Sequence, residues 1–253
     1  MSIILDGTSG INTPNTFAYK NLLIDAGFTI NQRGYVSAAT LASGAYGHDR
    51  WKAGASGGDY SFTQLASNTQ ITIASGKSLI QVVEDKNVSG TSYVLSWTGT
   101  AQARYAVNSA TPAGSYAASP IVITGQTAGT TMSVEFNTGT LSKPQLELGA
   151  VATSFDQRAY SQELAMCQRY YEQYVGYGLR VYANNVSRFI TLWSVPKRST
   201  PTFTSSFTSS TGLASNSSAA CGVYGIGWDL QFTAGGIGVI DLQGGTIIGN
   251  AEL

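Results

Sequence analysis

Short apolar segments separated by turn residues recur between residues 21 and 148. Residues 61–65 and 69–73 alternate apolar and polar positions with a period of two, which is typical of strands with one buried face. Residues 79–83 are apolar nearly throughout, as in a strand covered on both faces. Similar segments are 21–24, 93–98, 104–107, 121–123, 131–136 and 142–148. This spacing predicts a β-sandwich or barrel of the jelly-roll type over residues 19–160.

One helical pattern follows this series of strands. Ser161 is suited to cap a helix, and Glu163 places a negative charge in its first turn. Apolar and aromatic positions then recur at intervals of three and four, so we expect a linking helix over residues 161–175. Tyrosines on nearly every side are unusual for a surface helix and indicate an element wedged between domains or subunits. The oligomer-interface candidates are Tyr170, Tyr171 and Tyr174.

The two ends of the chain differ in pattern. Residues 176–253 predict a smaller C-terminal β-domain with strands near 177–182, 188–193, 200–204, 223–232 and 235–242. Between them, residues 205–218 are rich in Ser and Thr, and we expect a loop or weak hairpin there. Residues 1–18 predict an extended attachment arm, because a segment so short cannot close a core. The fold class is therefore mainly β, with one linking helix.

Composition narrows the choice of partners. Charged residues make up 11% of the chain, and 14 basic residues balance 14 acidic ones. A neutral chain has no long-range attraction to nucleic acid or to anionic membrane surfaces, so we expect neither as a partner. No apolar run is long enough to predict membrane insertion, and the first residues lack the pattern of a signal peptide. We therefore expect synthesis in a cytoplasm and release by another route, such as an assembled particle.

Several segments resemble phage and prophage tail-fibre proteins. Residues 145–174 contain Gln-Leu-Glu-Leu-Gly, then Ala-Thr-Ser-Phe-Asp-Gln-Arg, then Glu-Leu-Ala-Met-Cys-Gln-Arg-Tyr-Tyr-Glu, which is similar to a motif at the end of a carbohydrate-binding-module-like jelly roll in that family. Residues 21–24, 28, 32–34 and 49–51 resemble the start of that domain, and residues 5–11 resemble the head of many phage fibre proteins. Residues 196–202 and 251–253 resemble segments after the helix. The chain departs at Lys197, where the family usually has Met, and we expect little consequence.

The resemblance implies a phage virion protein, usually homotrimeric, whose jelly roll can bind glycans. On that basis we expect a tail-fibre or tail-tip receptor-binding component that attaches to host-surface glycan, with residues 1–18 joining other particle proteins. A purely structural component of the tail, collar or head remains an alternative. A polysaccharide depolymerase is a more distant one, because such enzymes usually carry long β-helix repeats and no repeat is evident here.

The sequence contains no recognisable catalytic constellation, and we expect no enzyme. His48 is the only histidine and no Gly-x-Ser-x-Gly segment occurs, so His48 is interpreted as structural. Carboxylates that could act as a hydrolytic pair fall on different predicted strands, and Glu147 lies within the family motif, where a structural hydrogen bond is the better interpretation. These carboxylates are Glu84, Asp85, Glu135 and Glu147.

Cofactors and disulfides are not expected either. A structural calcium ion is possible in jelly rolls of this type, but no Asp-x-Asp loop occurs, and the interpretation that no metal binds is favoured. Cys167 and Cys221 are interpreted as two thiols, although the sequence leaves a disulfide open. The calcium-ligand candidates are Asp25, Asp49, Asp59 and Asp156.

Sugar binding requires aromatic rings that stack on pyranose faces, with polar side chains beside them. Trp51 matches a family core position and Trp97 lies in an apolar strand, so both are assigned to the core. Tyrosines in turn-rich segments are better placed to meet a ligand. The glycan-binding candidates are Tyr46, Tyr60 and Tyr116.

Overall fold

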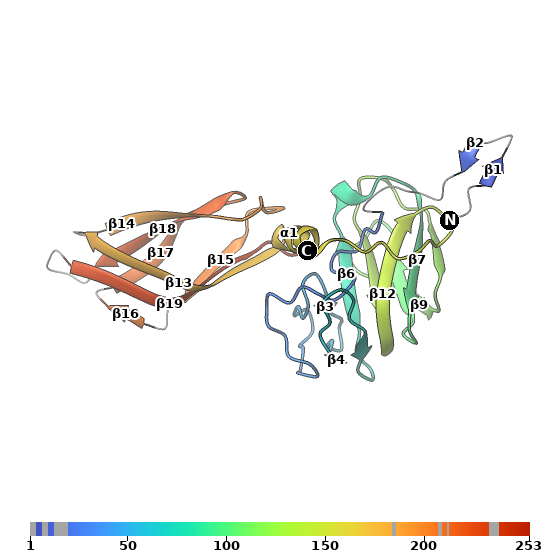
Figure 1. Cartoon of the computed structure of the whole chain (residues 1–253), viewed down its shortest axis with the longest axis horizontal. Helices are drawn as coiled ribbons and strands as arrows, with labels where there is room; N and C mark the ends of the chain where they lie inside the picture. Colours follow the sequence, from blue (N-terminus) through green and yellow to red (C-terminus); the bar gives the residue numbers. More distant parts are fainter. Residues whose placement is uncertain are drawn as a thin grey trace. The chain divides into compact units, whose positions relative to one another are not determined.

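The computed structural model describes residues 4–6, 10–12, 20–183, 186–206, 209–211, 213–232 and 238–253. The chain divides into two compact units (Figure 1). Unit 1 comprises residues 1–29 and 35–160, and unit 2 comprises residues 30–34 and 161–253. Within the expected N-terminal arm, β1 (Ile4–Asp6) pairs antiparallel with β2 (Gly10–Asn12). The remainder of residues 1–18 lies outside the described residues.

Unit 1 is a jelly-roll sandwich of two five-stranded antiparallel sheets, which confirms the predicted fold class. From β5 to β8, and again from β9 to β12, successive strands alternate between the sheets. One sheet has the order β10-β7-β12-β5-β4 and the other β3-β6-β11-β8-β9. The strands are β3 (Lys52–Ala53), β4 (Tyr60–Phe62), β5 (Ile71–Ile73), β6 (Leu79–Val83), β7 (Ser92–Thr98), β8 (Ala103–Ala106), β9 (Ala113–Ala117), β10 (Ile121–Thr124), β11 (Met132–Phe136) and β12 (Gly139–Leu148), with a 3-10 turn at Asp85–Asn87.

The core of unit 1 lies between the two sheets. Both sheets contribute side chains to it, for example Val134 and Phe136 from β11 and Leu141 and Leu146 from β12. Trp51 is fully buried and stacks on Phe28, with ring centroids 4.9 Å apart. Trp97 meets Phe136 edge to face. Both tryptophans therefore lie in the core, as the sequence predicted.

The edge strand β4 is covered by hydroxyl groups. The Ser37 hydroxyl accepts a hydrogen bond from the Phe62 N–H and donates to the Phe62 carbonyl, both at 2.8 Å. The Tyr35 hydroxyl lies 3.2 Å from both the N–H and the carbonyl oxygen of Tyr60. These side chains occupy positions that a neighbouring strand would otherwise fill, so they protect an edge that could pair with another chain.

Residues 21–24 were expected to form a strand, and this prediction is wrong. Their backbone is held by side chains and by β12 instead. The Asn21 carboxamide oxygen accepts hydrogen bonds from the N–H groups of Leu23 and Leu146, each at 3.0 Å, and its Nδ2 donates to the Pro144 carbonyl. The Ile24 N–H donates to Gln81 at 2.7 Å. An apolar segment can thus be buried without joining a ladder when polar side chains satisfy its backbone.

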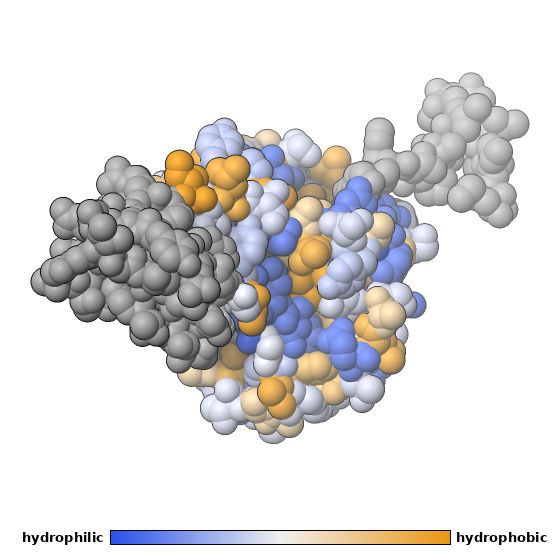
Figure 2. Space-filling view, turned by 60° about the vertical axis from the view of Figure 1, so that its left-hand side comes forward, coloured by the Kyte–Doolittle hydropathy of each residue, from blue (hydrophilic) through white to orange (hydrophobic). Residues whose placement is uncertain are grey.

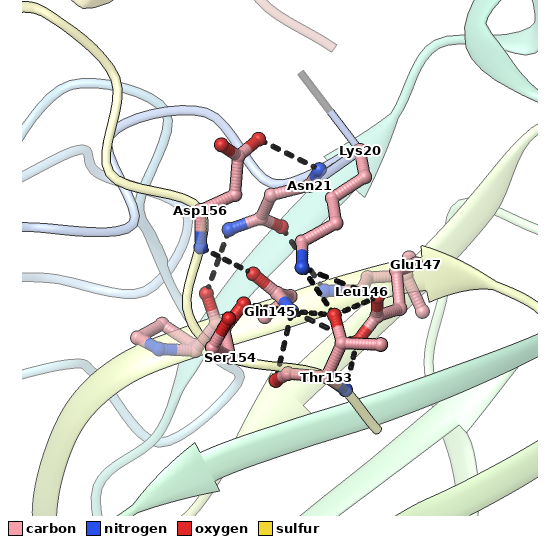
Figure 3. A network of polar contacts seen from close by, with 9 residues as sticks. Lys20, Asn21, Gln145, Leu146, Glu147, Thr153, Ser154 and Asp156 are labelled. Carbon is pink, nitrogen blue, oxygen red and sulfur yellow. Dashed lines mark hydrogen bonds and ion pairs between the residues drawn. The ribbon is translucent and has the colours of Figure 1, made fainter. Parts of the chain in front are cut away.

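The same region connects the two ends of unit 1 (Figure 3). Glu147 accepts hydrogen bonds from the Thr153 N–H at 2.8 Å and the Thr153 hydroxyl at 2.6 Å. The Gln145 Oε1 atom accepts a hydrogen bond from the Asp156 N–H at 2.7 Å. Arg158 donates to the carbonyl groups of Asn21 and Leu23. We call Asn21, Gln145, Glu147, Thr153 and Arg158 the terminal latch. It confirms that Glu147 makes structural hydrogen bonds.

In its described residues, unit 2 has one helix and two groups of strands. One sheet has the order β13-β19-β15, with β16 also paired to β19, and the other has the order β14-β18-β17. The elements are α1 (Tyr160–Gln168), β13 (Tyr171–Ala183), β14 (Val186–Leu192), β15 (Thr202–Ser206), β16 (Ser209–Thr211), β17 (Leu213–Gly222), β18 (Gly225–Phe232) and β19 (Gly238–Asn250). Residues 205–218 were expected to form a loop or weak hairpin, but their described part lies mostly in β15, β16 and β17, because pairing with β18 and β19 supplies the backbone hydrogen bonds.

The helix is shorter than predicted. It ends at Gln168. Tyr170 lies in the turn that follows, and Tyr171 and Tyr174 lie in β13, where Tyr171 pairs with Asn250. The Lys197 ammonium group donates to the Gln168 carbonyl at 2.7 Å and so satisfies a group that the helix leaves open. Aromatic residues favour strands, and a partner strand was available for them. Ser161 lies inside the first turn and is therefore not the expected cap.

Residues 30–34 belong to unit 2 although the chain on both sides belongs to unit 1. The Gln32 side chain donates to the Tyr171 carbonyl at 2.9 Å. The Arg33 guanidinium lies 3.6 Å from the centre of the Tyr171 ring and 3.0 Å from Glu252 Oε1. The segment is thereby attached to both the first strand and the last residues of unit 2.

A buried ion pair completes unit 2. Lys197 and Glu172 contact each other with side chains that are 0% and 1% exposed, and the backbone N–H of Ser194 also donates to Glu172. The expectation that Lys197 matters little is therefore wrong in this chain. Burial alone would raise the pKa of Glu172, but hydrogen bonds from Lys197 and Ser194 outweigh it and hold that pKa below its usual value.

Candidate functional site

A hollow on the outer face of the β3-β6-β11-β8-β9 sheet brings together aromatic, cationic and amide side chains. Its volume is about 290 Å³. Strand register explains why the groups meet: Glu135 of β11 lies opposite Arg104 of β8, and β8 pairs with β9, which carries Tyr116. We call this hollow the Tyr116 pocket. The lining residues used below are Lys77, Ser78, Arg104, Tyr116, Glu135 and Asn137.

An ion pair forms the base of the Tyr116 pocket. Arg104 Nε donates to Glu135 Oε2 at 2.6 Å, and the Ser78 hydroxyl donates to Glu135 Oε1, also at 2.6 Å. Glu135 is buried, whereas Arg104 is partly exposed. The hydrogen bond to Glu135 raises the pKa of Arg104 further, so the guanidinium keeps its charge throughout the accessible pH range.

Tyr116 lies beside this ion pair. The Arg104 guanidinium carbon is 4.8 Å from the centre of the Tyr116 ring, a distance suited to a cation–π contact. Partial burial, and then the charge of Glu135, raise the pKa of the Tyr116 hydroxyl, which therefore stays protonated. The side chain is half-buried, so part of it remains available to a ligand.

Gly54 lies against the Ser78 and Glu135 side chains and leaves no room for a side chain of its own. A Cβ atom at Gly54 would lie 2.0 Å from the Ser78 hydroxyl and 2.9 Å from Glu135 Oε1. Real atoms do not approach so closely, and any side chain at residue 54 would displace the partners of the carboxylate. The geometry of the ion pair thus depends on a backbone position without a side chain.

The arrangement offers the chemistry expected of a sugar site. An aromatic ring can stack on a pyranose face, while N–H groups of Arg104, Lys77 and Asn137 can donate to ligand oxygens. On the face of unit 1 that Figure 2 shows, hydrophobic residues lie in small groups between hydrophilic ones. A second, more open hollow of about 480 Å³ lies over β4 and β5, but its lining residues carry no formal charge.

The three glycan-binding candidates have different surroundings. Tyr116 lines the pocket. Tyr46 is half-buried and forms an isolated β-bridge with Lys52, and it does not line the Tyr116 pocket. Tyr60 is 1% exposed, so the expectation that it faces a ligand is wrong: its ring packs in the core beside Tyr35. A turn-rich sequence around a tyrosine did not predict exposure, because Tyr60 begins β4 and its side chain points inward.

The His48 side chain is fully buried and bonded to the protein on both ring nitrogens. Its Nδ1 lies 2.6 Å from the Tyr60 hydroxyl and its Nε2 lies 2.9 Å from Gln64 Oε1. The Tyr60 hydroxyl also accepts the backbone N–H of His48, so its own proton is directed to Nδ1. This assigns the neutral tautomer with hydrogen on Nε2. Burial lowers the pKa of His48, which agrees with a structural role.

Two of the three interface candidates are buried within the chain. Tyr170 is 1% exposed, and the Tyr171 ring is covered by Arg33. Their assignment to an oligomer interface is therefore wrong, and its cause is the helix that ends before them. Tyr174 is partly exposed, and its hydroxyl donates to the Leu192 carbonyl at 2.9 Å. Tyr174 remains a candidate.

The remaining candidates have structural partners or separate locations. Glu135 and Glu147 lie on different sheets and are each bonded to neighbouring side chains, whereas Glu84 is buried and Asp85 is exposed. In the described part of the chain, no three His, Cys, Asp or Glu side chains form a group that could hold a metal, and Asp25, Asp49, Asp59 and Asp156 are not brought together. Cys167 and Cys221 are free thiols, and Cys221 lies in β17.

Sequence reasoning did not identify Arg104, Lys77 or Asn137 as site residues. The alternation in residues 104–107 and 131–136 places Arg104 and Glu135 on polar faces of their strands, which was a usable signal. Their pairing depends on the register of β8 against β11, and the sequence does not reveal that register for two residues 31 positions apart.

Comparison with known proteins adds little. No family model and no curated protein matches the chain. Wild-type discoidin II from Dictyostelium discoideum is similar at 10% identity over 92% of each chain, with a TM-score of 0.26. The native recombinant discoidin II of the same organism is similar at 9% identity over 89% of this chain and 92% of that one, with a TM-score of 0.24. Scores this low carry no argument about arrangement or function. In the described residues, no helix is both long and apolar enough to cross a membrane.

Proposed function

We propose that this chain is a bacteriophage virion protein, a tail-fibre or tail-tip component that attaches to host-surface glycan through the Tyr116 pocket. The virion assignment is supported by the resemblance of residues 145–174 to a tail-fibre motif. The glycan assignment is supported by one observation, the placement of Tyr116 against the Arg104–Glu135 pair in a hollow of about 290 Å³. Binding, not catalysis, is the role proposed.

A sugar ring would lie against the exposed part of Tyr116. Its oxygens would accept hydrogen bonds from Arg104 and Asn137, both of which line the same hollow. The rigid base formed by Glu135 and Ser78 fixes the Arg104 side chain before a ligand arrives, which lowers the entropy cost of binding.

The proposal includes assembly as a homotrimer and attachment to other particle proteins through residues 1–18. Unit 2 carries large apolar side chains that its own residues leave exposed, and they replace Tyr170 and Tyr171 as interface candidates. They are Val175, Ile190, Leu192 and Tyr224, each between 68% and 74% exposed.

Competition for host adsorption tests the attachment role. Purified protein should block adsorption of the parent phage, and Tyr116→Ala should abolish the block while leaving the unfolding midpoint within a few degrees. Tyr160→Ala is the matched control, because Tyr160 is an exposed tyrosine at the start of α1 and does not line the pocket. Equal competition by the two variants would remove the pocket from the attachment mechanism.

A second candidate is a purely structural virion protein of the tail, collar or head. The exposed apolar side chains of unit 2 favour it, because such groups serve contacts between proteins rather than sugar binding. Incorporation into particles without any competition for adsorption would support this alternative. Mass measurement in solution checks the trimer in both cases, and a monomer at micromolar concentration would contradict it.

A further inference from the structure

Donors and acceptors are unequally available in the Tyr116 pocket. Both Glu135 oxygens already accept hydrogen bonds, one from Arg104 and one from Ser78. The Asn137 carboxamide oxygen accepts the Gln102 N–H at 2.8 Å. The acceptors that line the pocket are thus largely used by the protein itself.

Most hydrogen-bond donors of the same lining residues, in contrast, are not used by the protein itself. Arg104 uses Nε for Glu135, and within the described residues its two terminal nitrogens have no hydrogen-bond partner. The same holds for Nδ2 of Asn137. The Lys77 ammonium donates to the Ser56 carbonyl at 2.8 Å and keeps further N–H groups. A ligand in this hollow therefore meets N–H groups in excess of free oxygens.

The formal charges of the lining residues also favour a ligand that accepts hydrogen bonds. Arg104 and Lys77 are cations and Glu135 is the one anion among the lining residues named here, so the lining has an excess of positive charge. Asp59 lies 3.7 Å from the Lys77 ammonium and offsets part of it, but both side chains are partly exposed, so water screens that pair.

We propose that the Tyr116 pocket selects an acidic sugar and binds its carboxylate with the terminal nitrogens of Arg104 and the ammonium of Lys77. The proposal rests on the glycan-binding function above and names the substrate class of that site. The free end of a guanidinium presents two parallel N–H groups, which match the two oxygens of a planar carboxylate. Tyr116 then receives the face of the same sugar ring.

The expected preference is large enough to measure. Hydrogen bonds to charged groups are stronger than those between neutral groups, and losing one charged contact typically lowers affinity by about tenfold or more. Neutralising the ligand carboxylate should therefore weaken binding by at least about tenfold. Raising the salt concentration should weaken binding of the acidic ligand and leave binding of the neutral ligand nearly unchanged.

The test compares two ligands that differ only at the carboxyl group, which is an anion in one and a neutral ester in the other. Oligogalacturonate and its methyl ester have the same sugar rings, and titration calorimetry with the full chain measures both. Lys77→Met removes one proposed contact on a partly exposed side chain, so folding should survive. Lys86→Met is the matched control, because Lys86 is an exposed lysine of unit 1 in the 3-10 turn and lies outside the pocket.

Arg104→Lys is the second variant. It keeps a positive charge beside Glu135 but removes the paired N–H groups. We expect Lys77→Met and Arg104→Lys each to reduce the ratio of acidic to neutral affinity several-fold, and Lys86→Met to leave it unchanged. Thermal unfolding of each variant separates loss of selectivity from loss of fold.

The outcomes distinguish this inference from the proposed function. Binding of the methyl ester as tightly as the acid, or an unchanged ratio in Lys77→Met and Arg104→Lys, would overturn the acidic preference and leave glycan binding intact. No binding of either ligand, or of neutral or other acidic oligosaccharides, would overturn the glycan-binding function itself. A preference for sulfated or phosphorylated sugars over carboxylated ones would overturn the assignment to a carboxylate.

Discussion

Lys197 and Glu172 form an ion pair whose two side chains are almost completely buried in unit 2. The ammonium group also donates to the Gln168 carbonyl at the end of α1. One lysine therefore connects the end of the helix to the start of β13. The resembling family usually has Met at this position, and Met could fill the space but could make neither contact.

Replacing Lys197 should lower the free energy of unfolding. Lys197→Met leaves Glu172 buried without its cation, and breaking one half of a buried pair typically costs about 3–5 kcal/mol. Urea unfolding of the full chain measures the change. Adding Glu172→Gln should recover much of the loss, since a neutral amide no longer needs a cation. A single variant as stable as the parent protein would contradict the structural role of the pair.

Stability should fall between pH 7 and pH 5 because of His48. Its pKa in the folded chain is lowered by burial, from an ordinary value of about 6.5. The unfolded chain therefore binds a proton first as the pH falls, and the stability that neutral His48 contributes is complete above about pH 6.5 and declines below it. Thermal unfolding at several pH values should show a steeper decline for the parent protein than for His48→Gln. Parallel curves would contradict this assignment.

Asn21→Ala should weaken the terminal latch. The substitution leaves the N–H groups of Leu23 and Leu146 and the carbonyl of Pro144 without their partner in a buried setting. Each unsatisfied buried group costs about 1–3 kcal/mol, so the total should exceed about 2 kcal/mol. Chemical denaturation measures it, and Asn87→Ala at an exposed position serves as the control. Equal effects of the two variants would disprove the latch.

Ser37→Ala should expose the edge of β4. The amide hydrogen of Phe62 then loses its acceptor, and its exchange with solvent should accelerate by about tenfold or more while global stability changes little. Hydrogen exchange measured by NMR reports the effect. Ser43→Ala, in an exposed turn, should leave the Phe62 amide unchanged. Unaltered exchange in Ser37→Ala would show that the edge is protected by another group.

The fold was easier to predict from the sequence than the site, and particular residues show why. Period-two alternation predicted β5, and short apolar segments between turn residues predicted β6, β7 and β11, because the burial of a strand's faces leaves a local pattern in the sequence. The predicted helix was too long, because tyrosines with helical spacing are also compatible with a strand. Whether these residues form a helix or a strand depends on pairing with β19, which is distant in sequence. Tyr60 and Tyr116 could not be separated, since exposure depends on how strands pack.

The motif that carries the resemblance illustrates the same limit. Four residues of the motif make contacts inside a single unit. Gln145 and Glu147 make theirs within unit 1, and Tyr171 and Glu172 make theirs within unit 2. Such residues identify a fold. The residues of the Tyr116 pocket lie outside the motif, so a match to it says nothing about what ligand the pocket takes.

The segment at residues 30–34 has a consequence for modular exchange. Because Gln32 and Arg33 belong to unit 2, a recombination junction placed near residue 160 would not transfer unit 2 whole. In a hybrid that takes its C-terminal part from a relative, residues 30–34 would come from the recipient protein. The residues that correspond to Tyr171 and Glu252 would come from the donor protein. Functional hybrids, whether natural or engineered, should therefore be those in which that five-residue segment matches the incoming half, and the same segment must be supplied when unit 2 is expressed alone.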